Sequence, residues 1–361
     1  MPTQRWQGPP VKRGLGVGGT LGLVLGSLAT LVVLLVVGAA LLDGGSGKDT
    51  TTPVAIPSYD PYDDDEPFAK PSYAASDEPG EKETRSERPT PSSERLTPSR
   101  EPTPSRQPTR RPEPEVTLDT SLKTNTMYKA GILPRLRCPA GNASIYNHTQ
   151  LKALILKTGN CMNQAWRPVL EKQGIKFSPP RYAIASGRGR GACGDYPQPG
   201  SMVPYYCPRN NTIYASTSAM ARGNGNARGY GQILSWHGGI ISMMAHEYGH
   251  HVQNITGLMD SWWQQTLASS SQSGKLELSR RLELQATCFG GMWMRSVAAS
   301  YPVSTANRNK LFWFYGQVGD YPGWPRDHGK PVNNHRWFRQ GWERNQAYQC
   351  NTWMAPASTV S

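Results

Sequence analysis

The chain has 361 residues, with 39 Lys and Arg against 26 Asp and Glu, which gives a formal net charge of +13. The excess is concentrated after residue 118, where 26 basic residues stand against 10 acidic ones. A field of that sign favours anionic partners such as cell-wall polymers, lipid head groups or acidic peptides. Nucleic acid is excluded as a partner because the chain carries no nucleic-acid-binding motif and because its basic region is expected outside the cytoplasm.

The N-terminal segment predicts a membrane anchor. Residues 14–42 contain no charged side chain and are rich in Leu, Val, Ala and Gly, and about 20 such residues span a bilayer. Because three basic residues lie within residues 1–13, the positive-inside rule predicts a cytoplasmic tail there. We therefore expect a single-pass protein of the cell membrane whose remaining chain is extracytoplasmic. A signal peptide cleaved near the small residues 38–40 is the alternative, although the apolar run is longer than a usual signal-peptide core.

The next segment, residues 43–118, has the composition of a linker. It is rich in Pro, Ser, Thr and charge, and it has too few apolar residues to form a core. Such a proline-rich chain behaves as a semi-rigid spacer, so we expect a disordered stalk between the membrane and the following domain. Residues 119–361, roughly 240 in number, are enough for one domain with a real core.

The first part of this domain gives weaker signals. Helices are expected around residues 149–158 and 161–173. The alternating, β-rich residues from Asn211 to Ser216 predict a short strand. That strand is either a plain structural strand or an edge along which an extended peptide substrate is added.

The strongest motif follows at residues 246–250, which read HEYGH, an instance of H-E-x-x-H. On a helix, positions i and i+4 share one face, so His246 and His250 can direct an imidazole nitrogen at the same ion. Glu247 then lies where a metal-bound water would be. Zinc hydrolysis needs these groups: neutral nitrogen ligands, an open coordination position and a carboxylate that takes the proton of the water.

The flanking sequence supports a buried helix around the motif. Apolar residues recur at helical spacing from residue 236 to residue 255, and Gly257 is a typical helix stop. The alternative is a core helix whose two histidines form hydrogen bonds within the protein and bind no metal. In that case Glu247 would be a buried charge without a partner.

A third ligand must come from elsewhere in the chain. The metzincin extension requires glycine at 253 and histidine at 256, but the chain has Gln253 and Thr256. A glutamate from a later helix gives the His, His, Glu set instead. Apolar residues three and four apart predict that helix over residues 273–298. Of its two glutamates, Glu283 lies on the core side and is the predicted ligand, whereas Glu277 falls in the polar first turn as a solvated carboxylate.

Four blocks of sequence resemble the bacterial neutral zinc metallopeptidase family. They run in order over about residues 182–353 and read GACG with SMVPYYCPRNNTIY, HEYGHHVQ, ELQATCFGGMW, and HRWFRQGW with QCNTW. The resemblance implies a zincin-like α+β domain that holds one catalytic zinc ion. It also implies that His246, His250 and Glu283 bind this ion and that Glu247 is the catalytic base.

The chain departs from the family pattern at one position. The family commonly reads ELQAD, where this chain has Thr287. An aspartate there resembles the carboxylate that orients a zinc-bound imidazole in related peptidases, and losing such a partner typically costs about ten- to a hundredfold in metal affinity or activity. A threonine hydroxyl can form a hydrogen bond but brings no charge. We therefore expect either weaker zinc binding or a partner from another part of the chain.

Peptide hydrolysis also needs a hydrogen-bond donor for the developing oxyanion. The family carries His-Gly at an offset similar to that of His328, which is the predicted transition-state donor. The alternative is a loop histidine without a role, and Tyr315 and Tyr321 are weaker candidates. His251 points about a hundred degrees away from His250, so it is expected to contact a neighbouring loop.

All six cysteines follow the stalk, and an even number in an exported region favours disulfides. Closeness in the sequence, together with the family blocks that contain the last four cysteines, predicts three disulfide bonds: Cys138–Cys161, Cys193–Cys207 and Cys288–Cys350. The absence of a CxxC pair argues against a cysteine-based zinc site. Trp262 and Trp263 follow the motif helix and are candidates to line a substrate cleft.

Together these features predict a membrane-anchored, extracytoplasmic zinc metallopeptidase that hydrolyses peptide or protein substrates with a water activated by Glu247. Two alternatives remain open. One is a zincin-like module that binds cell-wall or protein partners without turnover; Thr287 leaves this open, and the intact Glu247 argues against it. The other is a zinc amidase that acts on peptidoglycan peptides.

Overall fold

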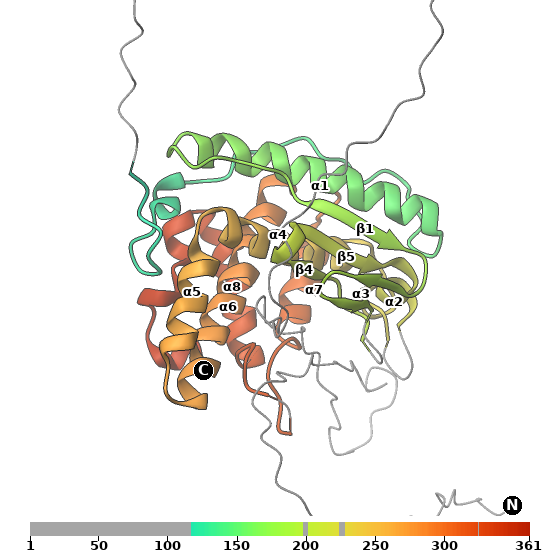
Figure 1. The fold of residues 1–361 in the computed structure, drawn as a ribbon. Helices are drawn as coiled ribbons and strands as arrows, with labels where there is room; N and C mark the ends of the chain where they lie inside the picture. The colour runs from blue at the N-terminus through green and yellow to red at the C-terminus, as the bar shows by residue number, and fades with distance from the viewer. Residues whose placement is uncertain (1–116, 198–200, 224–227, 324) are drawn as a thin grey trace, which may run out of the picture.

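The computed structural model describes residues 117–197, 201–223, 228–323 and 325–361, which form a mixed α and β domain (Figure 1). The predicted tail and anchor, and nearly all of the predicted linker, lie outside these residues. Across the described ranges, no helix combines the length and the apolar character that crossing a membrane requires.

A small sheet occupies one side of the domain (Figure 1). Its three strands are β1 (Arg181–Ala185), β4 (Tyr205–Cys207) and β5 (Thr212–Ser216), in the order β1-β5-β4. β5 runs parallel to β1 and antiparallel to β4. A separate hairpin pairs β2 (Gly189–Gly191) with β3 (Gly194–Tyr196).

The strand predicted from Asn211 to Ser216 is confirmed as β5, but it is not a sheet edge. It lies between its two neighbours, and all five of its residues are buried. Of the two alternatives for this strand, the plain structural strand is confirmed and the substrate-binding edge is wrong. An alternating pattern predicts that a segment is a strand, but it does not predict which strands pair with it or whether it lies at the edge of the sheet. Within the described sheet, β1 and β4 are the edges.

Helix α1 (His148–Glu171) crosses the top of the view in Figure 1, beside β1. The two helices expected around residues 149–158 and 161–173 are one continuous helix. The side chain of Asn147 caps its start by accepting a hydrogen bond from the Gln150 main-chain N–H. Two short helices follow β5, α2 (Thr217–Arg222) and α3 (Tyr230–Leu234).

The other side of the domain is helical. It contains α4 (Gly238–Ile255), α5 (Leu258–Ala268), α6 (Gln272–Val297), α7 (Thr305–Tyr315) and α8 (Pro331–Arg344). The bounds of α4 and α6 agree with the predicted helices to within about two residues. Short 3-10 helices complete the chain: η1 (Thr126–Ala130), η2 (Pro208–Asn210), η3 (Ala347–Cys350), η4 (Thr352–Met354) and η5 (Ala357–Thr359).

Helix α4 is the central element of the core. Every residue from Gly238 to Gln253 is buried, with α6 packed along one side. The two helices approach so closely that a Cβ at Gly249 would lie 2.9 Å from the Ala286 Cα. Helix α6 in turn packs against α8, where a Cβ at Gly341 would lie 2.0 Å from the Cys288 carbonyl oxygen. Glycine at these two positions allows three helices to pack as one layer.

The three predicted disulfide pairings are confirmed. Cys138–Cys161 ties the N-terminal part of the domain to α1, and Cys193–Cys207 ties the hairpin to β4. Cys288–Cys350 joins α6 to η3 across a sequence separation of 62 residues. Each bond restricts the unfolded chain, and the third closes the longest loop.

Candidate metal centre

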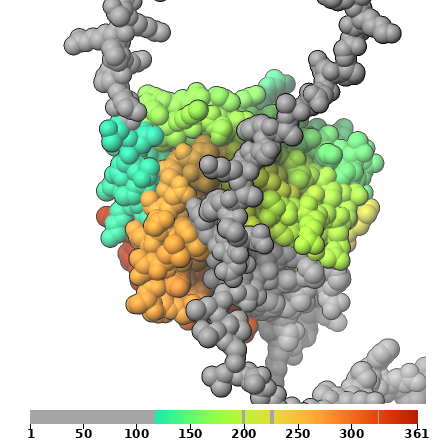
Figure 2. Space-filling model, in the orientation of Figure 1, coloured from blue at the N-terminus to red at the C-terminus, as the bar shows by residue number. Residues whose placement is uncertain are grey.

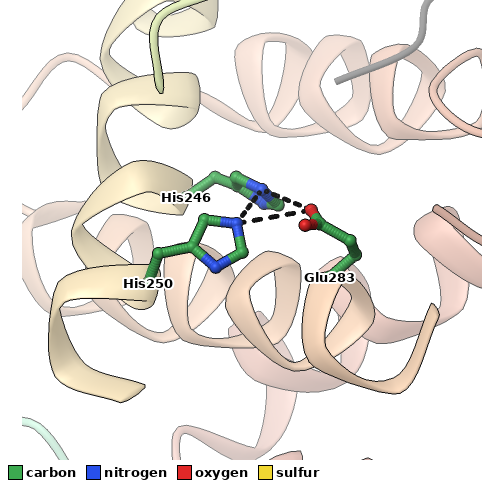
Figure 3. Close-up of side chains that lie close together, drawn as sticks. All are labelled: His246, His250 and Glu283. Atoms are coloured by element: carbon green, nitrogen blue, oxygen red, sulfur yellow. Dashed lines mark hydrogen bonds and ion pairs between the residues drawn. The ribbon is translucent and has the colours of Figure 1, made fainter. Parts of the chain in front are cut away.

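Three side chains from two helices converge in the core, as Figure 3 shows: His246 and His250 from α4 and Glu283 from α6. The His246 and His250 Nε2 atoms lie 3.2 Å apart, and each lies 3.3 Å from Glu283 Oε2. A tetrahedral zinc site with bonds of about 2.0–2.1 Å has neighbouring ligand atoms about 3.3–3.4 Å apart. The three predicted ligand atoms therefore have the chemistry and the spacing for one zinc ion. Their binding of a metal stays a prediction.

The second nitrogen of His250 is held by an amide. His250 Nδ1 lies 2.9 Å from Gln253 Oε1, while Gln253 Nε2 donates to the Leu282 carbonyl oxygen and to Gln285 Oε1. Because an amide oxygen can only accept, His250 carries its proton on Nδ1. Burial alone would lower the pKa of His250, but Glu283 and Glu247 outweigh it and raise this pKa to about 9, so an ion at this site would displace a proton from Nε2. The neutral ring that remains, with its proton on Nδ1, is the tautomer that a zinc ligand needs.

His246 is held by a longer chain of hydrogen bonds. Its Nδ1 lies 3.1 Å from the Thr287 hydroxyl, which donates at 3.2 Å to Asn334 Oδ1. Asn334 Nδ2 donates to the carbonyl oxygens of His328 and Gly329. Since Thr287 uses its proton on Asn334, its oxygen accepts the proton of His246 Nδ1. Thr287 thus contacts the imidazole as expected, and Asn334 on α8 supplies the support that sequence reasoning missed.

Glu247 lies beside these ligands with only 2 % of its surface exposed. Its Oε2 accepts a hydrogen bond of 2.8 Å from the Tyr206 main-chain N–H on β4, and its Oε1 has no partner among the described residues. Burial raises the pKa of Glu247 to about 8, against the opposing effect of His250. A cation held by the three ligand atoms would lower this pKa again. A buried oxygen without a partner next to a metal site is what a general base requires.

The second glutamate of α6 has a different environment. Glu277 is 42 % exposed in its side chain and pairs with Arg281 at 2.8 Å. Glu277 is therefore a solvent-exposed carboxylate near the start of α6, as predicted.

His328, the predicted oxyanion donor, lies against the same centre. It is buried, and its Nε2 lies 3.9 Å from Glu283 Oε2 without a hydrogen-bond partner among the described residues. Its Nδ1 lies 2.5 Å from Asp327 Oδ1. Burial alone would lower the pKa of His328, but Asp327 and Glu283 outweigh it and raise this pKa to about 9. The two carboxylates therefore favour the charged imidazole, which carries a proton on Nε2, the nitrogen that lies 3.9 Å from Glu283 Oε2.

Two acidic residues that position this loop were missed from the sequence. Asp327 directly precedes His328, and Asp320 accepts the main-chain N–H groups of His328 and Gly329 at 2.9 and 2.8 Å. Asp320, Asp327 and His328 also lie close enough together to hold a metal ion. Both Asp320 oxygens accept main-chain N–H groups of this loop and Asp327 Oδ1 contacts the His328 ring, whereas Asp327 Oδ2 is buried without a partner among the described residues. Neither aspartate has a motif spacing, so only the adjacency of Asp327 to His328 was available as a signal.

The other aromatic candidates have structural partners. The Tyr315 hydroxyl donates to the Ser242 carbonyl oxygen, and the Tyr321 hydroxyl donates to the Gln317 carbonyl oxygen. His251 Nδ1 lies 2.8 Å from Asn211 Oδ1 in the turn before β5, which confirms the expected loop contact.

A pocket opens onto the centre between β4, α5 and α6. It has a cavity volume of about 30 Å³ and is lined by Glu247, His250 and Glu283 together with Tyr205, Tyr206, Pro208, Met259, Trp262, Ser279 and Leu282. That volume holds about two water molecules. Of the two tryptophan candidates, Trp262 lines this pocket, whereas Trp263 is buried and is not among its lining residues. In Figure 2 the surfaces of α5 (orange) and of the strand region (yellow-green) lie on either side of the view.

Comparisons with known proteins agree with this chemistry. The model of a family described as "Putative neutral zinc metallopeptidase" matches residues 137–314, which confirms the family resemblance. The protein YpfJ of Escherichia coli (strain K12) is 27 % identical over 197 residues, which cover 52 % of this chain and 66 % of YpfJ. The protein Rv2575 of Mycobacterium tuberculosis (strain ATCC 25618 / H37Rv) is 27 % identical over 230 residues, which cover 56 % of this chain and 70 % of Rv2575. Both names describe the proteins as uncharacterized, and the chain spans slightly less than two thirds of YpfJ. No solved structure matches the chain.

Proposed function

We propose that the chain is a zinc-dependent peptidase, because residues 137–314 match the model of the neutral zinc metallopeptidase family. We assign its catalytic domain to the zincin-like fold. One observation carries the proposal: three ligand atoms lie 3.2–3.3 Å from one another beside the unpartnered oxygen of Glu247.

In this proposal His246, His250 and Glu283 hold one catalytic zinc ion. Zinc bound there would supply Lewis-acid polarisation of a carbonyl oxygen and would make a water molecule acidic at neutral pH. The hydrogen bonds from Nδ1 of each histidine to Gln253 and Thr287 keep both Nε2 atoms available as ligands.

The remaining steps belong to side chains of the protein. Glu247 takes the proton of the attacking water at Oε1 and passes it to the leaving amine, while the Tyr206 N–H fixes its other oxygen. His328 donates Nε2–H to the developing oxyanion, and the Asp327 carboxylate holds the opposite nitrogen. The edge strand β4 lies next to Glu247, so an extended substrate adds to β4 rather than to the central β5.

We also propose that the domain is extracytoplasmic and anchored in the cell membrane. This rests on the uncharged apolar residues 14–42 and on the three disulfides, which persist in oxidising compartments. Proteolysis of intact cells, with antibodies against the domain, tests the proposal. Digestion of the domain from outside is expected, and complete protection until the cells are lysed would contradict it.

Peptide cleavage by the full chain tests the enzymatic proposal. The oxidised protein in a nonionic detergent, loaded with zinc, is offered a mixed pool of peptides together with peptidoglycan peptides. Glu247→Gln keeps the three ligands but removes the base, so the cleavage rate should fall by about a hundredfold or more while zinc stays bound. Glu277→Gln makes the same charge change at an exposed carboxylate and should leave the rate unchanged.

The outcomes separate the three functions. Cleavage of ordinary peptides that is lost in Glu247→Gln supports the peptidase, and cleavage confined to peptidoglycan peptides identifies an amidase instead. A folded, zinc-loaded wild type that cleaves neither substrate would refute catalysis and leave a binding module.

A further inference from the structure

A second pocket lies towards the end of α6 opposite to the metal centre. Arg295 lines it and follows Glu283 by twelve residues on the same helix, a distance of about 18 Å along the axis. Arg135, Arg308 and Trp342 also line this pocket, which we call the arginine pocket, and its cavity volume is about 340 Å³. That volume lies within the range of about 300–1,000 Å³ that small-molecule sites occupy.

The charges of the arginine pocket are not balanced. None of its lining residues is acidic. Within the described part of the chain, Arg135 and Arg295 take part in no side-chain hydrogen bond or ion pair. Glu343 directly follows Trp342 on α8, but it is paired with Arg339 at 2.7 Å. Arg135 and Arg295 are exposed and Arg308 is half-buried, so solvent screens part of the repulsion among the three charges, and an anion between them would relieve the rest.

Arg308 adds an unmet hydrogen-bond donor. Its Nε is buried and has no partner in the described structure. The hydrogen bond that Arg308 does form is long, 3.4 Å from Nη2 to Asn309 Oδ1, and its guanidinium lies 5.9 Å from the centroid of the Phe312 ring. A buried donor without a partner costs free energy, so a ligand oxygen at this point would be stabilising.

The rest of the lining suits an oxyanion on a small organic body. The hydroxyl residues Ser304 and Thr305 stand at the start of α7, where the helix dipole adds further positive potential. Val303 and Trp342 provide apolar surface beside them. Guanidinium groups bind phosphate oxygens in pairs through parallel N–H donors, and three of them match a group with more than one negative charge.

We propose that the arginine pocket binds a phosphoryl group. The group belongs either to a soluble phosphorylated compound or to a phospholipid head group, since both present the same oxygens. The site is separate from the metal centre and does not depend on the peptidase proposal.

The test is a calorimetric titration of the oxidised full chain, in a nonionic detergent, with inorganic pyrophosphate at fixed ionic strength. Saturable binding is expected for the wild type. The double variant Arg135→Gln/Arg295→Gln removes two guanidinium groups, and the affinity should fall by about tenfold or more for each charge-assisted hydrogen bond that they donate. The variant Arg308→Lys keeps the charge but removes the Nε donor, and it should also weaken binding.

The control is Arg190→Gln/Arg336→Gln, which removes two exposed arginines outside this pocket and changes the net charge equally. Binding within about twofold of the wild type is expected for it, because neither arginine lines the pocket, while the net charge falls by the same amount as in the test variant. Loss of binding in the control equal to that in the test variant, or no saturable binding by the wild type, would overturn the proposal.

Competition identifies the source of the phosphoryl group. Short-chain phosphatidylglycerol and short-chain phosphatidylcholine are added against bound pyrophosphate. Displacement by phosphatidylglycerol alone supports a lipid head group as occupant, and displacement by neither supports a soluble phosphorylated compound. Equal displacement by both lipids would show a detergent-like effect and would contradict recognition of the anion.

Discussion

Thr287 is the residue at which this chain departs from the pattern of the family that it resembles, and the structure gives the departure a physical basis. The hydroxyl accepts from His246 and donates to Asn334, whose amide is fixed by two carbonyl oxygens of the His328 loop. A charged partner is thus replaced by a neutral relay that still fixes the tautomer of His246. The relay also joins His246, a proposed zinc ligand, to the loop that carries the proposed oxyanion donor.

Thr287→Val tests the relay, because valine has nearly the same shape and no hydroxyl. We expect the zinc affinity to fall by about tenfold or more, since His246 loses the acceptor of its Nδ1 proton. Competition with a chromogenic chelator measures this affinity. Thr158→Val is the matched control, because its buried hydroxyl bonds only to carbonyl oxygens of its own helix α1. An unchanged zinc affinity in Thr287→Val would contradict the relay.

Asp327 determines which form of His328 can donate. Because the carboxylate accepts at Nδ1, a neutral His328 would carry its only proton there and would present a lone pair at Nε2. Donation from Nε2 therefore needs the charged imidazole. The neighbouring Asp327 and Glu283 hold it in that form by raising its pKa to about 9 against the effect of burial.

Asp327→Asn should therefore lower kcat by about tenfold to a hundredfold while KM changes little, since the donor acts on the transition state. The raised pKa of His328 also falls when the charge of Asp327 is removed. Activity that needs the protonated ring is lost as the pH rises through this pKa, so the alkaline decline of kcat should move to lower pH. Rate profiles between neutral and alkaline pH measure both effects. Asp260→Asn, an exposed change on α5, is the control, and identical profiles for wild type and Asp327→Asn would contradict the assignment.

The residues differ in how far the sequence could predict them. His246 and His250 are one helical turn apart, and the periodicity of residues 273–298 placed Glu283 on the core side, so the structure brings together three residues chosen from spacing alone. Asn334 lies 47 residues beyond Thr287, and Tyr206 lies 41 residues before Glu247, and both contact the site only through the tertiary fold. Local patterns contain no information about such partners.

At the scale of elements, the geometry of the centre depends on how closely α4 and α6 pack, since each supplies ligands. Gly249 lies inside the HEYGH motif and is the point of closest approach to Ala286. Position 249 is one of the two variable positions of H-E-x-x-H, so the motif does not predict a glycine there. The reason for the glycine is its contact with Ala286 in the folded protein. The same limit applies to the strands, since β5 was predicted correctly while its central place in the sheet was not.

Gly249→Ala should separate the two helices. The added methyl would lie 2.9 Å from both the Cα and the carbonyl oxygen of Ala286, a main-chain contact that neither helix can avoid without moving. We expect the free energy of unfolding to fall by about 1–3 kcal/mol and the zinc affinity to fall with it. Urea denaturation and chelator competition measure the two quantities. Gly187→Ala is the control, because a Cβ there would meet nothing within 4 Å; equal behaviour of the two variants would refute the close-packing account.

At the scale of the whole molecule, the described domain combines a buried centre of two histidines and one glutamate with a strongly basic surface. The metal centre and the arginine pocket lie at opposite parts of α6, so the two proposals concern different surfaces and are tested with different ligands. The composition of residues 119–361 predicted a field favourable to anions, but only the structure gathers Arg135, Arg295 and Arg308 around one cavity. Arg135 and Arg295 are 160 residues apart and Arg295 and Arg308 are 13 residues apart, so no local sequence pattern predicts that they line one cavity.

The central claim is that one zinc ion is bound between α4 and α6. Anomalous diffraction above and below the zinc absorption edge, on crystals of the zinc-loaded protein, tests it most directly. We expect a single zinc peak within about 2.0–2.2 Å of His246 Nε2, His250 Nε2 and a Glu283 carboxylate oxygen. A peak at Asp320, Asp327 and His328 instead, or no peak at full zinc loading, would contradict it.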